Sequence, residues 1–186
     1  RLVDQALRSG EVMTALVSDL QDFTDLQAGA LSLERAPFSP HGLAARLRRE
    51  LGPVLSREGA ALEVAPDPGL PGRLAGDEAR IAQAARAFAV FLVEKAGARA
   101  LRLAIAHGDG RLALTLEAEA PGNGPVWQPE SVYGLDPGGA GDVASDSLGP
   151  MIARGLVTLM GGSLRVTRPA PGRARLEMRL PAPPAE

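Results

Sequence analysis

The chain has 186 residues, enough for one sizeable hydrophobic core or two small folded units. Its 22 acidic and 20 basic residues give a net charge of -2, which argues against a nucleic-acid binder with a basic stripe. The absence of cysteine excludes disulfides and thiolate chemistry, and no apolar run approaches the roughly 18 residues of a membrane span. The composition therefore favours a folded cytoplasmic protein with neither a nucleic-acid partner nor membrane contact.

Residues 2–28 are expected to form one long helix. Mostly apolar residues recur along this segment at alternating spacings of four and three, which is the pattern of a coiled-coil seam. The seam consists of Leu2, Ala6, Ser9, Met13, Leu16, Leu20, Phe23 and Gln27. A second apolar line through Val3, Leu7 and Val17 widens this face beyond a two-helix seam. Because one helix cannot bury both lines alone, we predict a homodimer through residues 2–28.

The next part of the chain alternates between helix and strand signals. Ser39 is a good N-cap for a helix over 40–58, which begins with proline. A short strand is expected over 61–66. Asp77 is placed to cap a further helix over 78–95.

The C-terminal half favours a hairpin, a helix and a second hairpin. Strict alternation over 100–107 and 111–120, joined by Gly-Asp-Gly, predicts two paired strands. A loop over 121–147 is rich in glycine and proline, as lids and mobile segments are. A helix over 151–160 and strands over 163–168 and 174–180 follow. The predicted fold class is α+β: a two-layer α/β sandwich, with a mixed sheet and helices on one face, preceded by a long helical dimerisation stalk.

This order of elements and several local strings resemble the C-terminal core of sensor histidine kinases. "LVSDLQDFTDLQAGALSLERAPFSP" resembles the second helix of the family's dimerisation hairpin and its exit into the catalytic domain. "GDEARIAQAARAFAVFLVEKAG" is similar to the segment with the asparagine motif, with Asp77, Arg80 and Gln83 in the expected places. "GPMIARGLVTLMGGSLRV" is similar to the helix and strand after the last glycine motif.

The resemblance implies a domain organisation. Residues 1–30 would be the second hairpin helix, 31–40 a linker, and 41–186 an ATP-binding-like domain of the gyrase–Hsp90–histidine kinase–MutL type. The family's phospho-accepting histidine would lie upstream of Arg1, so we expect the chain to be part of a longer protein. His41 is interpreted as a surface residue at a helix end and His107 as a strand-end residue, and neither a catalytic residue nor a metal site is expected.

The asparagine motif has lost its asparagines. In the family, an asparagine on this helix supplies an oxygen that helps to hold Mg²⁺, which requires hard oxygen ligands. The matching position here is Phe91, and the motif's other asparagine falls at Ala87. Phenylalanine offers no ligand, and we expect its bulk to occupy the space of the metal and phosphates.

The adenine-binding motif is also incomplete. Gly122 and Gly124 remain, but the family's aspartate, which accepts a hydrogen bond from the adenine amino group, is replaced by Ala120. Glu119 and Glu117 are near, yet strand alternation points both to the opposite face. A slip in strand register would bring one of them to the aspartate position.

The last glycine motif reads Ser145-Asp146-Ser147-Leu148-Gly149, so only Gly149 of three glycines is kept. Side chains at the other positions obstruct close backbone approach to a phosphate. Pro150 removes a backbone N–H from the helix start that would face the anion.

Two functions remain open from the sequence. The first is a degenerate kinase core without a cofactor, acting as a signalling and dimerisation module, with a response-regulator receiver domain as a further candidate partner. Its basis is the joint loss at positions 91, 120, 145 and 147. The alternative is an active protein-histidine kinase that uses Mg-ATP and phosphorylates a histidine upstream of this chain for transfer to a response regulator.

Overall fold

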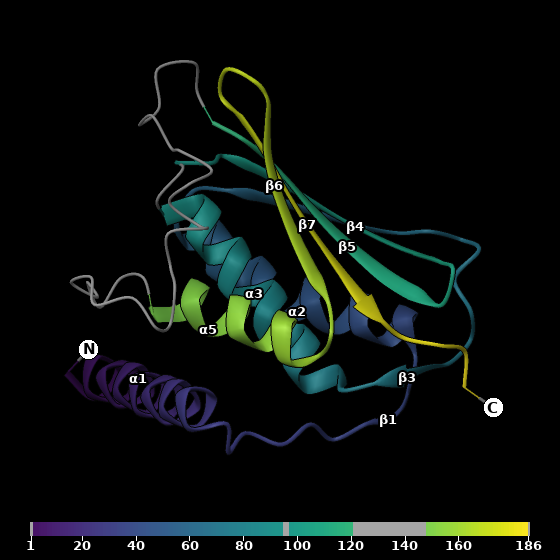
Figure 1. The fold of residues 1–186 in the computed structure, drawn as a ribbon. Helices are drawn as coiled ribbons and strands as arrows, with labels where there is room; N and C mark the ends of the chain where they lie inside the picture. Colours follow the sequence, from purple (N-terminus) through teal and green to yellow (C-terminus); the bar gives the residue numbers. More distant parts are fainter. Residues whose placement is uncertain (1, 95–96, 121–147, 186) are drawn as a thin grey trace.

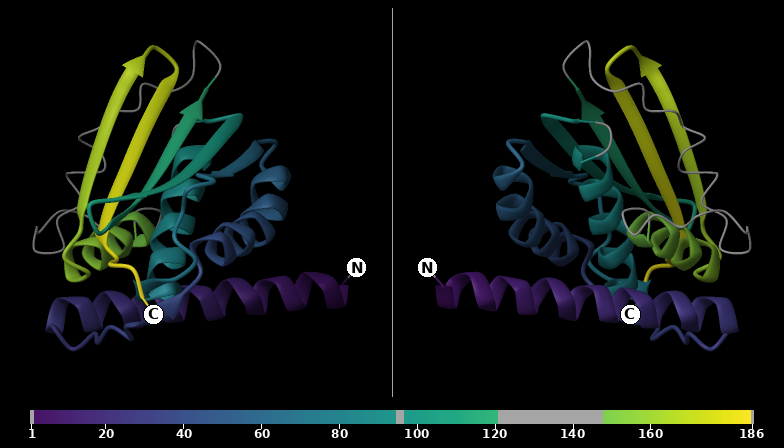
Figure 2. Two further views of the ribbon diagram at one scale, coloured as in Figure 1. Left: turned by 90° about the vertical axis from the view of Figure 1, so that its right-hand side faces the viewer. Right: turned by 90° about the vertical axis from the view of Figure 1, so that its left-hand side faces the viewer.

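The structure of the protein is a computed structural model that describes residues 2–94, 97–120 and 148–185. For residues 2–9, 11, 12, 15 and 16 it describes the backbone alone. A five-stranded mixed sheet is covered on one face by three helices, and α1 lies against these helices on the side away from the sheet (Figures 1 and 2). The predicted α/β sandwich, a mixed sheet with helices on one face, is confirmed.

The helices begin where the sequence provides caps. Helix α2 spans Pro40–Arg57, and the Ser39 side chain accepts a hydrogen bond from the Gly42 N–H at 3.2 Å. Helix α3 spans Glu78–Glu94, and Asp77 caps it by accepting from the Arg80 N–H at 3.0 Å. Each cap satisfies a backbone donor that the first helical turn leaves without an intrahelical partner.

Helix α1 spans Leu2–Ala28, as the sequence predicts, and ends at Gly29, whose φ of 65° is easy for a residue without a Cβ. Figure 2 shows it running along the other helices, with its N-terminal end extending past them. The helix is therefore present in the predicted range, and its role as a dimerisation stalk stays a prediction, as do the three domain boundaries.

The sheet has the strand order β2-β4-β5-β7-β6. Its strands are β2 (Ala61–Pro66), β4 (Ala100–Gly108), β5 (Arg111–Glu119), β6 (Ser163–Ala170) and β7 (Arg173–Pro181). Strand β2 runs parallel to β4, and every other neighbouring pair is antiparallel. Both predicted hairpins are present, and β7 joins them by pairing with β5.

The turn between β4 and β5 is one residue shorter than the sequence suggested. Gly108 still pairs with Arg111, which leaves Asp109 and Gly110 as the two turn residues. Both have positive φ, 51° and 70°, as expected for a tight hairpin turn of the primed type.

Two short strands were not predicted. Strand β1 (Ala36–Phe38) lies in the segment read as a linker and pairs with β3 (Leu74–Gly76) in a separate antiparallel sheet. Three residues are too few to show alternation, so their pairing depends on contacts distant in sequence.

Helix α5 spans Leu148–Leu159 and thus begins three residues before the predicted start at 151. Pro150 lies within this helix because a proline fits the first helical turn, where no intrahelical N–H bond is required. At its other end Gly161 has a φ of 72°, and the Gly162 N–H donates to the Val157 carbonyl at 2.8 Å.

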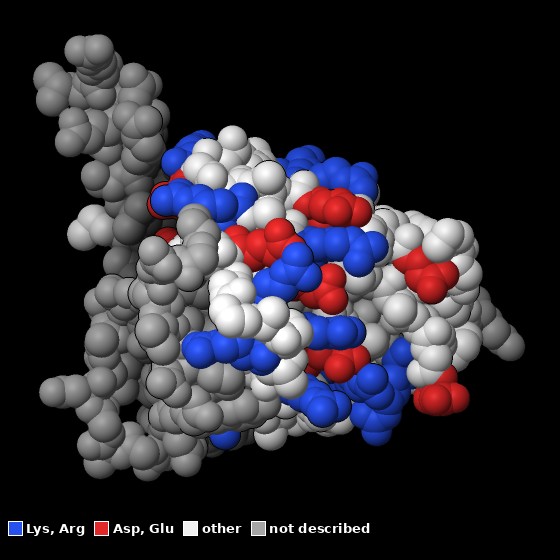
Figure 3. All heavy atoms as spheres, turned by 90° about the horizontal axis from the view of Figure 1, so that it is seen from above, with Lys and Arg blue, Asp and Glu red and all other residues white. Residues whose placement is uncertain are grey.

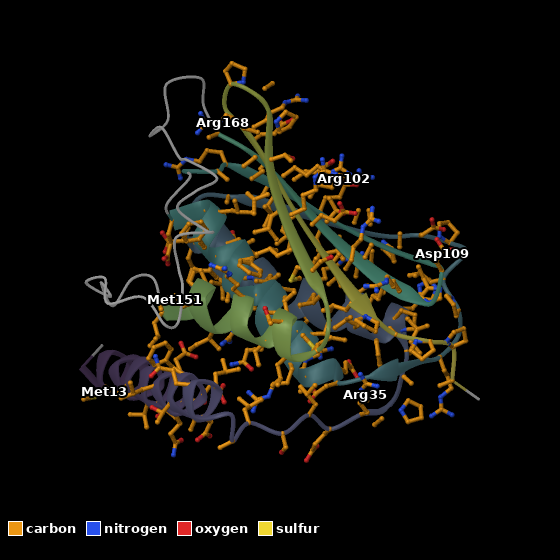
Figure 4. The ribbon with its side chains drawn as sticks, in the orientation of Figure 1. Met13, Arg35, Arg102, Asp109, Met151 and Arg168 are labelled. Atoms are coloured by element: carbon orange, nitrogen blue, oxygen red, sulfur yellow. The ribbon has the colours of Figure 1, made fainter. Side chains whose placement is uncertain are left out.

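The core lies between the sheet and the helices. Alternate residues of β4, β5 and β7 point into it, as Leu103, Leu114 and Leu176 do. The opposite face of the sheet carries arginines and glutamates, which alternate across the strands in Figure 3 and include the labelled Arg102 of Figure 4. Arg102 lies 3.4 Å from Glu63 and 3.7 Å from Glu117, so this face is a network of exposed ion pairs.

Candidate functional site

The candidate site lies where α1, α3 and the first turn of α5 come together. Helix α5 packs directly on α3: a Cβ placed on Gly149 would lie 3.7 Å from the Ala87 Cβ. Figure 4 labels Met151 at this end of α5, above α1. The structure thus brings together Ala87, Phe91 and Gly149, three of the positions that the resemblance assigns to a nucleotide pocket.

These residues line a cavity of about 380 Å³ between the helices. Its walls are mostly apolar, with four residues that carry polar or charged side chains. The lining consists of Asp19, Val54, Gln83, Arg86, Ala87, Val90, Phe91, Glu94, Gly149, Pro150, Ile152 and Ala153. Phe91 is only 7% exposed and forms part of the wall, so it narrows this space without filling it.

Asp19 brings a carboxyl group from α1 to the cavity. Burial raises its pKa above the ordinary value of 3.8, the nearby Arg86 guanidinium lowers it, and Asp22 raises it again. Desolvation therefore outweighs the attraction of Arg86. An acidic group partly withdrawn from water therefore lines the same cavity as Ala87, Phe91 and Gly149.

Arg80 and Gln83, which the sequence placed in the asparagine motif, contact α1. Arg80 Nη1 donates to both carboxylate oxygens of Asp22, at 3.0 and 2.9 Å, and to Gln83 Oε1 at 2.8 Å. Gln83 Nε2 donates to Asp22 Oδ2 at 2.7 Å. We call these three residues the Asp22 network; it is a closed set of hydrogen bonds that fixes α1 on α3.

Asp77, the motif's aspartate, has both carboxylate oxygens occupied. Oδ1 caps α3, and Oδ2 accepts from the Glu34 N–H at 2.9 Å, while the residue as a whole is 8% exposed. Its role is to fix the start of α3 and the segment that leads out of α1.

A second contact fixes the C-terminal half of α1. A Cβ placed on Gly155 of α5 would lie 3.0 Å from Leu26 Cδ1, so the bare glycine backbone provides the room for this leucine. Together with the Asp22 network, this close contact holds the last two turns of α1 on the domain.

The position of the adenine aspartate lies at the end of β5. Ala120 is half-buried, and its N–H donates to the Gly172 carbonyl at 2.7 Å. Glu119 pairs with Arg173 at 2.8 Å on the outer face of the sheet, and Glu117 lies between Arg102 and Arg175 on that same face. The register of β5 is regular, so no slip brings either glutamate to the position of Ala120.

The remaining motif positions, Gly122, Gly124, Ser145 and Ser147, lie outside the described residues, as does the predicted mobile loop over 121–147. The nucleotide-binding role assigned to all eight motif positions stays a prediction.

The predicted dimer residues of α1 fall into two groups. Met13 and Leu20 are 67% and 59% exposed, and Val17 of the second line is 60% exposed. Phe23 packs partly buried against the core. Leu2 and Leu16 are among the residues whose side chains the structure does not describe.

The two histidines lie apart from this site. His41 is exposed in the first turn of α2, and His107 Nε2 lies 2.9 Å from the Ala182 carbonyl. Within the described ranges, no group of three or more histidine and acidic side chains is arranged to hold a metal ion. Among the helices so described, none is both long and apolar enough to cross a membrane.

The sequence analysis missed the part that α1 plays in this site. It treated the helix as a coiled-coil seam and did not consider its polar residues. Asp19 and Asp22 stand three residues apart, which places them on one helical face, and Arg80 and Arg86 of α3 offer complementary charges. That complementarity was the available signal.

Several solved structures that match the fold are histidine kinases, although no family model matches the chain. Full-length ShkA, crystallised in complex with AMPPNP, is 26% identical with a TM-score of 0.76; the alignment covers 96% of this chain and 37% of ShkA. The Acinetobacter baumannii histidine kinase AdeS is 16% identical with a TM-score of 0.73, covering 97% of this chain and 83% of AdeS. The mycobacterial sensor histidine kinase MprB is 19% identical with a TM-score of 0.61, covering 82% of this chain and all 100% of that one.

The chain therefore has the fold of a histidine kinase C-terminal core, and the resemblance inferred from its motifs is confirmed. These relatives support a module of a two-component sensor kinase. The chain spans about a third of ShkA's length, 37%, so the activity of a whole kinase is a matter for proposal.

Proposed function

We propose that this chain is the core of a two-component sensor histidine kinase that has lost nucleotide binding and serves as a signalling and dimerisation module. The observation that carries the proposal is the chemistry of the cavity. The cavity wall carries Phe91 at the position matched to the family's metal-binding asparagine, and the carboxyl groups of Asp19 and Glu94 belong to the same lining.

Charge and hydrogen bonding both disfavour Mg-ATP in this cavity. A triphosphate in this cavity would meet the carboxyl group of Asp19, and Pro150 withholds a backbone N–H at the start of α5. At the adenine end, Ala120 leaves the amino group of the base without its acceptor, which costs about 1–3 kcal/mol. Each loss of about 1.4 kcal/mol weakens binding tenfold, so several together bring affinity beyond the millimolar range.

The alternative is an active kinase with an unusual pocket. Two observations favour it: the cavity remains open beside Phe91, and ShkA, the 26% identical relative, was crystallised with AMPPNP. Calorimetric titration with Mg-ATP separates the two functions. Absence of binding at millimolar ligand supports the degenerate module, and micromolar binding supports the kinase.

The dimerisation part of the proposal rests on the exposed stripe of α1, formed by Met13, Val17 and Leu20. These residues are spaced by four and three, so they share one helical face, which differs from the face that carries Asp22 and Leu26 onto the domain. Three large apolar side chains in a row on a helix surface are typical of a helix–helix interface.

Light scattering tests the dimer. We expect Val17→Glu with Leu20→Glu to convert a dimer of the unmodified chain into a monomer, because charges replace the centre of the stripe. Ser18→Glu, an exposed position on another face of the same helix, is the matched control and should stay dimeric. A monomeric unmodified chain would refute this part of the proposal.

A further inference from the structure

We infer that the outer face of the five-stranded sheet binds an acidic helix of a protein partner. The inference goes beyond the proposed function and does not depend on it, because this face lies on the side of the sheet away from α3, α5 and the cavity between them (Figure 1).

The alternation of the strands creates this outer face. Leu103 and Ile105 of β4 and Leu112 and Leu114 of β5 are buried toward the helices, so the residues between them point away from the helices. Figure 3 views the sheet from this side, and Figures 1 and 2 place all the described helices on the other side. Side chains of the outer face are therefore accessible to a partner.

Arginines outnumber glutamates on the outer face, although the whole chain has a net charge of -2. The glutamates are contributed by three strands and are Glu63, Glu117, Glu119 and Glu177. The arginines are contributed by four strands and are Arg102, Arg111, Arg165, Arg173, Arg175 and Arg179. The face thus carries an excess of positive charge.

This excess is located on Arg111 and Arg165. Each glutamate of the face already lies within 3.7 Å of an arginine, which is Arg102, Arg173 or Arg179. Arg111 and Arg165 are exposed, and neither forms an ion pair with a carboxylate of the described residues. Since a guanidinium group binds a carboxylate through two parallel hydrogen bonds, both arginines offer sites for acidic side chains of another molecule.

A patch of small side chains lies beside these arginines. Ala65 of β2 is next to Ala104 of β4, which pairs with Thr115 of β5, and Ala106 pairs with Ala113 on the same face. Neighbouring strands lie about 4.8 Å apart, so the patch is about 10 Å wide across three strands, which is close to the diameter of a helix. A partner helix can therefore come close to the backbone of the sheet at this patch.

A helix that lies along β4 and β5 over the patch meets arginines on several sides. Arg111 is at the end of β5 next to the hairpin turn, and Arg102 is at the opposite end of the patch, in register with Glu117. Arg165 flanks the patch on β6. The distance along the strands from Arg111 to Arg102 is about 20 Å, which a helix of about 14 residues covers.

The mixed charge of the face favours a protein partner over a nucleic acid or a lipid surface. Glu117 and Glu177 stand among the arginines, so a continuous row of phosphates would meet carboxylates as well as guanidinium groups. A helix instead presents single carboxylates at particular positions, which can face Arg111 and Arg165 while small side chains face the patch.

The binding experiment uses the full chain and a rhodamine-labelled, alanine-based helical peptide of about 15 residues with a glutamate at every fourth position. Its matched control is the same peptide with glutamine in place of glutamate. We expect fluorescence anisotropy to give a dissociation constant of about 100 μM or lower for the acidic peptide at low salt, roughly tenfold below that of the glutamine peptide. Duplex DNA and anionic phospholipid vesicles are titrated under the same conditions.

Variants of the chain identify the surface. Arg111→Glu with Arg165→Glu should weaken binding of the acidic peptide at least about tenfold. Arg49→Glu with Arg57→Glu makes the same change in net charge at exposed positions of α2, on the other side of the sheet, and should leave binding within about twofold. No binding of the acidic peptide, equal binding of the glutamine peptide, equal effects of the two double variants, or tighter binding of DNA or vesicles than of the peptide would each overturn the inference.

Discussion

The contact between α1 and the domain should depend on Asp22. This carboxylate accepts from Arg80 at 3.0 and 2.9 Å and from Gln83 at 2.7 Å, and the side chains of Arg80 and Asp22 are only 26% and 13% exposed. Exposed ion pairs contribute about 0–1 kcal/mol, whereas breaking a fully buried pair costs about 3–5 kcal/mol. The partial burial of this pair places Asp22→Ala between these limits, at about 2 kcal/mol, equivalent to about a 30-fold change in the docking equilibrium.

Amide exchange of the C-terminal half of α1 measures that equilibrium directly. Asp22→Ala should accelerate exchange over residues 20–28 by about 30-fold and leave the strands β4 and β5 unchanged, because the change undocks a helix without opening the core. Asp25→Ala, an exposed position on the same helix, is the control.

A double-mutant cycle assigns the effect to the pair. If Asp22 acts through Arg80, Asp22→Ala and Arg80→Ala should be strongly non-additive, with a coupling energy of about 1–2 kcal/mol. Equal exchange rates in Asp22→Ala and Asp25→Ala, or additive effects in the cycle, would refute the reasoning.

Two further predictions concern stability. Gly162→Ala should destabilise the fold by several kcal/mol in chemical denaturation, because the added Cβ would lie 2.5 Å from Leu180 Cδ2 and close to two backbone carbonyls. Gly52→Ala is the control: it lies inside α2 with open space around it and should stabilise the fold by about 0.5–1 kcal/mol. Equal effects of the two substitutions on the free energy of unfolding would contradict the packing described. Burial raises the pKa of Asp19, so ionisation of this carboxyl group makes the docked state of α1 less favourable. As pH rises above 3.8, the unfolding free energy of the Asp19→Asn variant should therefore increase relative to that of the unmodified chain. A difference in unfolding free energy that does not change with pH would contradict that assignment.

Local signals in the sequence were sufficient for most of the fold. Ser39 and Asp77 each cap a helix by accepting from a backbone N–H three residues further along the chain, so the local sequence is enough to predict both caps. Alternation and the Gly-Asp-Gly turn were likewise sufficient to predict the hairpin of β4 and β5. The start of α5 was placed three residues too late, so that Leu148, Gly149 and Pro150 were left outside a helix whose first turn accepts proline.

Features that depend on distant contacts were beyond such signals. The pairing of 36–38 with 74–76 joins two three-residue strands that have no pattern of their own. The parallel alignment of β2 with β4 was not predicted either, since it depends on how the helices between them pack.

In the candidate site, too, the motif positions could be predicted from the sequence, whereas the residues that α1 contributes could not. The motif comparison brought Ala87, Phe91 and Gly149 to one place, and the structure has them around one cavity. It did not predict Asp19 and Asp22, because the docking of α1 is a tertiary contact that the heptad pattern does not contain. The expectation that the Phe91 ring takes the space of the metal and phosphates stays a prediction; the structure has the ring in the wall of the cavity.

The central claim is that nucleotide binding has been lost through several separate changes. Because metal, adenine and phosphate are held by different parts of the site, restoring one part should recover little. Phe91→Asn alone should leave Mg-ATP unbound and, since the ring is buried, should lower stability by about 3 kcal/mol. Combining it with Ala120→Asp, Ser145→Gly and Ser147→Gly should restore measurable binding.

The most direct test is calorimetric titration of Mg-ATP into the unmodified chain, each single variant and the combined variant. Our account predicts no heat of binding at millimolar nucleotide for the unmodified chain and the single variants, and measurable binding for the combined variant. Micromolar binding of Mg-ATP by the unmodified chain would contradict it and would identify the protein as an active kinase.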